Sequence, residues 1–125
     1  GIEVRIDARQ EPELSNNNGT WEFTDILLFA LAPETENTGM IFWGQNRLPQ
    51  GTDAACVKND SGYTAEIAVP ISWVQRRQGE QWSRIRMNIC VDDLDEKDEG
   101  AVQLWWKPDW RKEKNYAGSG LFLRE

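Results

Sequence analysis

The sequence predicts one antiparallel β-sandwich domain over residues 1–125, jelly-roll or immunoglobulin-like, with about seven or eight short strands. Several segments alternate apolar and polar residues with a period of two, which is typical of half-buried strands. The segments between them are rich in Gly, Asn, Asp and Pro. No long helical pattern and no internal repeat interrupts this succession, so we expect an all-β fold.

The first half of the chain contains three predicted strands. Residues 2–8 alternate between apolar and polar side chains, as a half-buried strand does. Residues 25–32 form a continuous apolar run that ends at Pro33, and eight residues are short for a helix, so we expect a buried central strand. Residues 39–44 predict a third strand, and residues 21–23 could add a short one.

The second half begins with a predicted hairpin. Residues 54–58 and 63–69 flank the turn signal Asn59-Asp60-Ser61-Gly62. Residues 71–75 predict one helical turn, followed by a polar loop. Further strands are predicted over residues 85–91, 101–106 and 121–123.

The charge and composition exclude several classes of function. The chain has 14 Lys+Arg against 21 Asp+Glu, a formal charge of −7, which argues against a nucleic-acid partner or an anionic membrane surface. It lacks the apolar run of about 18 residues that membrane insertion requires. It contains no histidine, which rules out Ser-His-Asp catalysis and histidine-ligated zinc or haem.

Two cysteines and many carboxylates do not by themselves indicate an enzyme. Cys56 and Cys90 have neither a histidine partner nor CxxC spacing, so a catalytic thiol is disfavoured. They fit either one disulfide or two buried thiols. A small hydrolase that uses two carboxylates is the weakest alternative. The chain has 21 acids, and any two of them could form such a pair, so their number is not evidence for catalysis. We therefore expect no catalysis.

Seven tryptophans are more than a core of this size needs, and three of them lie close together near the C-terminus. Adjacent strand residues face opposite ways, so Trp105 and Trp106 cannot share one core face. An exposed indole beside amides and charged groups is suited to stacking on a sugar ring, which predicts a carbohydrate site. The alternative interpretation is that these rings only pack against one end of the sandwich. The candidate ligand-binding residues are Trp110, Trp106, Trp105, Asp109, Arg111, Lys112, Asn115 and Tyr116.

The acidic segment after residue 91 is a candidate calcium-binding site, because calcium prefers oxygen ligands. Asp93, Asp95 and Asp98 are the candidate ligands for a structural ion. The EF-hand spacing fails because Lys97 occupies a ligand position, and a solvated loop is the favoured interpretation. No cofactor is required.

Four segments in a fixed order resemble the family 9 carbohydrate-binding modules and the DOMON-related sandwiches. These segments are Ile2–Asp7 (IEVRID), Gly62–Pro70 (GYTAEIAVP), Ile85–Asp93 (IRMNICVDD) followed by Asp95, and Gly118–Leu123 (GSGLFL). The resemblance implies a jelly-roll-like sandwich that binds glycan ends between two tryptophans, often with structural calcium. One of those tryptophans corresponds to Trp110 or Trp106. The family's leading strands and its other clamp tryptophan precede the IEVRID strand, and we expect them to be missing here.

The expected function is therefore non-catalytic carbohydrate binding, as a module of a larger exported protein located outside the cell, in the periplasm or on the cell surface. The expected partners are a glycan chain and a neighbouring domain of the same parent protein. The alternative is a structural or protein-interaction β-sandwich that has lost the sugar site, with its tryptophans used for packing or for a protein contact.

Overall fold

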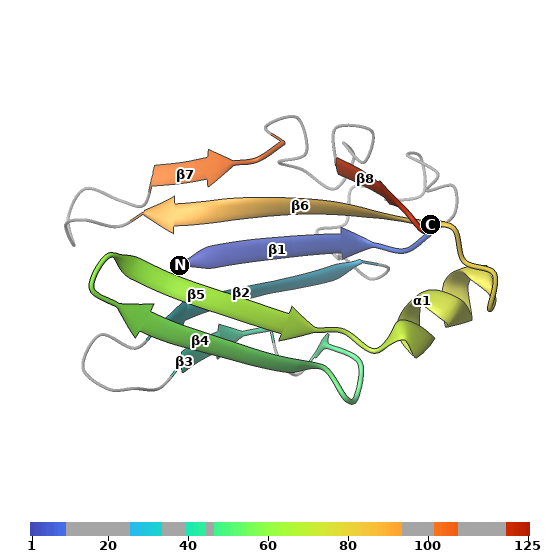
Figure 1. Ribbon diagram of the computed structural model, residues 1–125, viewed down its shortest axis with the longest axis horizontal. Helices are drawn as coiled ribbons and strands as arrows, with labels where there is room; N and C mark the ends of the chain where they lie inside the picture. The colour runs from blue at the N-terminus through green and yellow to red at the C-terminus, as the bar shows by residue number, and fades with distance from the viewer. Residues whose placement is uncertain (10–25, 34–39, 45–46, 94–101, 108–119) are drawn as a thin grey trace.

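The computed structural model describes residues 1–9, 26–33, 40–44, 47–93, 102–107 and 120–125. This part of the chain contains eight strands and one short helix, which confirms the all-β prediction (Figure 1). The elements are β1 (Ile2–Asp7), β2 (Leu27–Pro33), β3 (Met40–Trp43), β4 (Asp53–Asn59), β5 (Gly62–Ala68), α1 (Ile71–Gln78), β6 (Arg84–Asp93), β7 (Val102–Trp105) and β8 (Gly120–Leu123). The short strand expected at residues 21–23 lies outside the described residues.

The strands form a large sheet and a small sheet, all paired antiparallel. The large sheet has the order β3-β2-β1-β6-β7, and β8 also pairs with β6. Residues 90–93 of β6 pair with β7, whereas residues 84–87 pair with β8, so two strands share one edge of β6. The small sheet is the predicted hairpin β4–β5, closed by the pair Asn59 and Gly62.

One face of the large sheet carries the core, and we call it the inner face. Val4 lies opposite Phe29 on one side and Ile89 on the other, so the alternating apolar residues of β1, β2 and β6 form continuous rows. Val4 and Phe29 are fully or almost fully buried. Partly buried Ile67 of the small sheet packs against this core. The period-two pattern therefore decides which face of each strand is buried.

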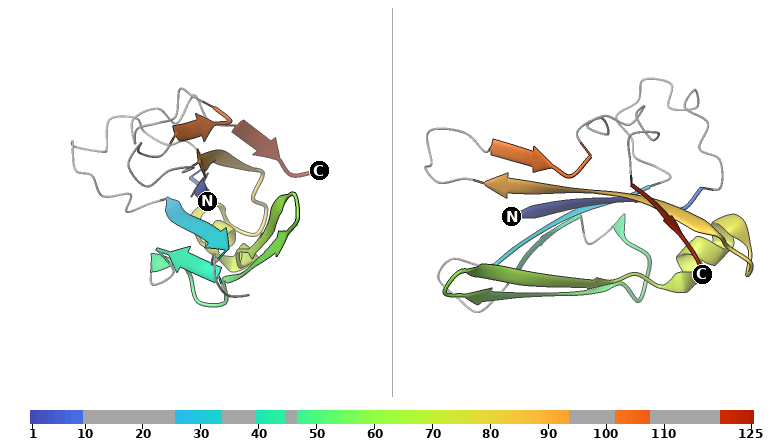
Figure 2. Two further views of the ribbon diagram at one scale, coloured as in Figure 1. Left: turned by 90° about the vertical axis from the view of Figure 1, so that its left-hand side faces the viewer. Right: turned by 45° about the horizontal axis from the view of Figure 1, so that its top comes forward.

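The small sheet lies across only part of the inner face. Its strand β4 packs against β2 and β3. Its strand β5 lies on the other side, toward β6 (Figure 2). The start of β5 and the end of β6 lie at the same end of the molecule (Figure 1). Burial, and then the negative charges of Cys56, Asp92 and Asp93, raises the pKa of the Tyr63 phenol near the start of β5.

The helix is longer than the single turn predicted over residues 71–75. It continues to Gln78 because its buried face, with Trp73 and Val74, completes the core at one end of the sandwich. It ends at Gly79, whose φ of 82° is accessible to glycine at little cost. Sequence periodicity could not reveal this extension, because the polar residues 76–78 resemble the loop that follows them.

Gln78 ties the helix to the ends of two strands. Its Nε2 donates to the carbonyl oxygens of Ala8 and Arg84, both at 2.6 Å, and its Oε1 accepts from the N–H of Ser83 at 3.2 Å. These bonds satisfy backbone groups where β1 ends and β6 begins. Within the described residues, no helix is long and apolar enough to cross a membrane.

Candidate functional site

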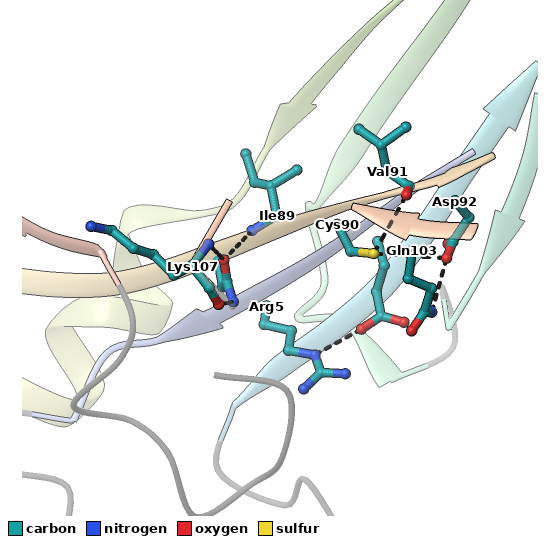
Figure 3. A network of polar contacts seen from close by, with 9 residues as sticks. Arg5, Ile89, Cys90, Val91, Asp92, Gln103 and Lys107 are labelled. Atoms are coloured by element: carbon teal, nitrogen blue, oxygen red, sulfur yellow. Dashed lines mark hydrogen bonds and ion pairs between the residues drawn. The ribbon is translucent and has the colours of Figure 1, made fainter. Parts of the chain in front are cut away.

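The side of the large sheet that faces away from the small sheet carries polar and charged side chains, and we call it the polar face. Its members alternate with the residues of the inner face along β1, β6 and β7, and Figure 3 shows several of them. They include Glu3, Arg5, Asn88, Cys90, Asp92, Gln103 and Trp105. Antiparallel pairing sets Glu3 opposite Cys90 and Arg5 opposite Asn88, which brings residues more than 80 positions apart into contact distance.

Trp105 lies on the polar face, next to Arg5. The guanidinium carbon of Arg5 lies 4.3 Å from the centroid of its ring. Arg5 is 7% exposed, and its Nε donates to Oε1 of Glu3 at 2.7 Å, so the guanidinium is held in place. A fixed cation over one face of a half-buried indole restrains the ring and contributes about 0.5–2 kcal/mol.

Asn88 fixes the chain at the point where β7 ends. Its fully buried side chain donates from Nδ2 to the carbonyl of Lys107 at 2.8 Å and accepts at Oδ1 from the N–H of Lys107 at 2.9 Å. The N–H of Trp106 donates to the carbonyl of Ile89 at 2.9 Å. The side chain of Asn88 thus fixes the backbone at Lys107, directly after Trp106, and extends the contact with β6 beyond the end of β7.

Polar groups that a ligand can reach lie beside Trp105. The Nε2 of Gln103 donates to Oδ1 of Asp92 at 2.9 Å, in an exposed position. Gln103 is exposed and Asp92 is half-buried, so the pair presents a second amide hydrogen and carboxylate lone pairs at the surface. A flat ring beside such groups is able to bind a ligand that has both an apolar face and hydroxyls.

Cys90 lies beneath this surface and is not a nucleophile. Burial, followed by the negative charges of Asp92 and Glu3, raises its pKa to about 11. At neutral pH the thiol is therefore protonated, which is the unreactive form. Cys56 lies on β4, on the other side of the large sheet, and both cysteines are free. Of the two alternatives left by the sequence, the structure contains two buried thiols.

Trp106 points to the opposite side of the sheet from Trp105, as strand alternation predicts. Its ring centroid lies 5.8 Å from that of Phe122 on β8 and 5.3 Å from Nζ of Lys107. The side chain is 51% exposed. The two adjacent tryptophans therefore do not form one site.

Gly120 makes room for the ring of Trp106. A Cβ atom at this position would lie 2.3 Å from two atoms of the indole, a distance that real Cβ contacts essentially never show. Only glycine lets the first residue of β8 pair with β6 while the indole lies against it. The glycine at the start of this predicted strand is thus explained by its packing against Trp106.

Most of the predicted ligand residues are not placed by the structure. Trp110, Asp109, Arg111, Lys112, Asn115 and Tyr116 lie outside the described residues, as do the calcium candidates Asp95 and Asp98. Asp93 lies exposed at the end of β6. No group of three or more acidic, cysteine or histidine side chains suited to a metal occurs within the described ranges.

The sequence did not predict four candidate residues of this face: Arg5, Glu3, Asn88 and Gln103. Each occupies a polar position of a strand in which apolar and polar residues alternate, but only the pairing of the strands brings these positions together. A shallow hollow also lies over the small sheet and is lined by Asp53, Ala54, Ala55, Glu66, Ile67 and Ala68. It contains no aromatic ring, so it does not match the predicted site.

Comparisons with protein-family models, with curated proteins and with solved structures found no match for this chain. The resemblance to the family 9 modules therefore depends on the sequence motifs alone.

Proposed function

We propose that this protein is a non-catalytic carbohydrate-binding module and that a sugar ring binds on the polar face at Trp105. The observation that carries this proposal is the restrained indole of Trp105, stacked 4.3 Å from Arg5 and flanked by exposed amide and carboxylate groups. Such a ring accepts the C–H face of a sugar, while neighbouring polar groups bind its hydroxyls.

The strength expected of such a site is modest. Gln103 and Asp92 offer a few hydrogen bonds, and one ring offers a limited stacking area. Millimolar to micromolar dissociation constants correspond to about −4 to −8 kcal/mol, which these contacts can supply. Trp110, in the segment that follows Lys107, is proposed as the second aromatic wall.

Two acids of β1 are each paired with an arginine, which makes these two carboxylates unsuited to catalysis. Glu3 is paired with Arg5 at 2.7 Å, and the fully buried Asp7 is paired with Arg9 at 2.8 Å. A glycosidase requires one carboxyl group with a raised pKa and a second one free to act on the substrate. The neutral thiol of Cys90 supplies no alternative nucleophile. We further propose that the module belongs to a larger exported protein.

The test is a glycan panel read by intrinsic tryptophan fluorescence, with and without calcium. It contains cello-, xylo- and chito-oligosaccharides together with insoluble cellulose, xylan and chitin. We expect a saturable change with one glycan class. Trp105→Ala should abolish the change, and Gln103→Ala, which alters only an exposed side chain, should weaken it several-fold.

The adjacent tryptophan provides the matched control. Trp106→Ala removes the same side chain from the opposite face and should leave glycan affinity unchanged. Loss of binding in Trp106→Ala with retention in Trp105→Ala would overturn the site assignment. A flat response from the folded protein across the whole panel would overturn the carbohydrate proposal and favour an interaction domain that has lost the sugar site.

A further inference from the structure

Five apolar side chains form an exposed strip on the inner face of the large sheet. They are Val91 (41% exposed), Val102 (61%), Leu104 (59%), Trp106 (51%) and Phe122 (39%). Core residues on this same face, Val4 and Phe29, are 4% and 0% exposed. The inner face is thus covered over β1 and β2 but left open over β7, β8 and the end of β6.

Strand pairing shows that the strip continues the core rows. Val91 lies opposite both Ile2 of β1 and Leu104 of β7. Phe122 lies opposite Ile85, which packs against the core. These residues occupy the inward-facing positions of their strands, as core residues do, but they are exposed. A contiguous apolar surface of this kind marks an interaction site.

The outer edge of β5 borders the strip. The small sheet consists of β4 and β5, and no described strand pairs with the other edge of β5. That edge lies toward β6 and β8, on the open side of the sandwich (Figure 2). An unpaired edge presents N–H and C=O groups that readily accept another strand. A strand added to β5 would therefore extend the small sheet toward the apolar strip.

We propose that this face binds one extended segment of another polypeptide, which pairs with β5 as a third strand of the small sheet and places alternate apolar side chains on the strip. This mode is β-augmentation, in which main-chain hydrogen bonds give affinity and side-chain contacts give specificity. The proposal does not depend on carbohydrate binding, because the polar face and the strip lie on opposite sides of the large sheet.

A second copy of this chain does not fit the same edge. Antiparallel pairing of two β5 strands is related by a two-fold axis perpendicular to the small sheet, so both large sheets lie on the same side of the joined sheet. Each large sheet extends beyond its own β5, and the two extensions would occupy the same space. The formal charge of −7 adds repulsion between copies. A single strand with no sheet beneath it avoids both problems.

The charges at the ends of the strip define the partner further. Exposed Asp93 lies at the end of β6, opposite Val102 and beside Asp92. Lys107 lies at the other end, next to the ring of Trp106. Since β5 starts near Asp93, an antiparallel partner would end there. We therefore infer a partner strand with an acidic residue near its amino end and a basic residue near its carboxyl end.

The test uses a fluorescein-labelled synthetic peptide of about nine residues, enough to span the seven residues of β5. It has valine at every second position, threonine between them, glutamate at the amino end and lysine at the carboxyl end. Titration with the 125-residue protein, followed by fluorescence anisotropy, should give saturable binding. Hydrogen exchange should show slower exchange of β5 amides in the presence of the peptide.

Leu104→Asp should weaken peptide binding at least about tenfold, because it places a charge in the apolar contact. Val102→Asp serves as a second variant if the first one unfolds. The matched control is Val57→Asp, because Val57 is 66% exposed on β4 away from the strip; it should bind normally. Glycan affinity should be the same in all three variants.

Three results would overturn this inference. One is the absence of both saturable binding and β5 protection. Another is equal weakening by Val57→Asp and Leu104→Asp. The third is a protein dimer in sedimentation equilibrium that Leu104→Asp dissociates, since that result would assign the strip to a second copy.

Discussion

Trp105 and Trp106 are neighbours in the chain but belong to different surfaces. The ring of Trp105 is stacked on a buried arginine among carboxylates and amides. The ring of Trp106 lies against a glycine and a phenylalanine and is half exposed. The difference shows that identical side chains acquire distinct chemistry from the residues across the strand pairs, so a tryptophan count cannot identify a binding site.

The largest expected effect comes from Asn88, which anchors the backbone directly after the two tryptophans. Asn88→Ala leaves the N–H and carbonyl of Lys107 without their partner, and the site is fully buried. We expect a loss of about 2–4 kcal/mol in the free energy of unfolding, measured by urea denaturation. Both the glycan and the peptide affinities should fall. A variant as stable as the wild type would contradict this supporting role of Asn88.

A smaller effect should be confined to the Trp106 side. In Gly120→Ala the new methyl group meets the indole of Trp106, so the ring must move. We expect a loss of about 1–3 kcal/mol, typical of overpacking. The same substitution in a Trp106→Ala background should cost clearly less, which a double-mutant cycle measures. Equal costs in the two backgrounds would show that backbone strain, and not the indole, is responsible.

The smallest effect should be confined to the Trp105 side and appears at high pH. The pKa of Cys90 is raised to about 11 by burial and by Asp92 and Glu3, whereas an unfolded thiol titrates about two pH units lower. The unfolded chain therefore loses this proton first, so stability is retained below about pH 9 and falls as the pH rises toward 11.

The measurement is the melting temperature between pH 8 and 11 for the wild type, Cys90→Ala and Cys56→Ala. Cys90→Ala should flatten part of the decline, whereas Cys56→Ala should not. Ionisation of Tyr63, whose pKa is also raised, contributes above about pH 10 in all three proteins. Identical pH profiles would show that Cys90 does not carry the effect.

Strand positions were predictable because buried and exposed residues alternate along each strand. Residues 2–8, 63–69 and 85–91 demonstrate this, since each predicted segment matches a strand of the structure to within about two residues at either end. The opposite orientation of Trp105 and Trp106 follows from the same geometry. These features depend on local sequence, which is why the sequence was sufficient.

Long-range pairing was not predictable. Nothing near Asn88 in the sequence indicates that its amide binds the backbone of Lys107, and nothing near Arg5 indicates stacking on Trp105, a hundred residues later. Both contacts arise because β6 lies between β1 and β7. The roles of the candidate ligand residues around Trp110 and of the calcium candidates Asp95 and Asp98 remain predictions.

The shared edge of β6 has a consequence for engineering. β7 and β8 are each registered on β6 by their own ladders, and Asn88 closes the junction between them. The alignment of either strand therefore does not depend on the length of the segment that joins them, residues 108–119. Changes in the length of that segment should therefore leave both strands in register on β6, because each ladder carries its own alignment.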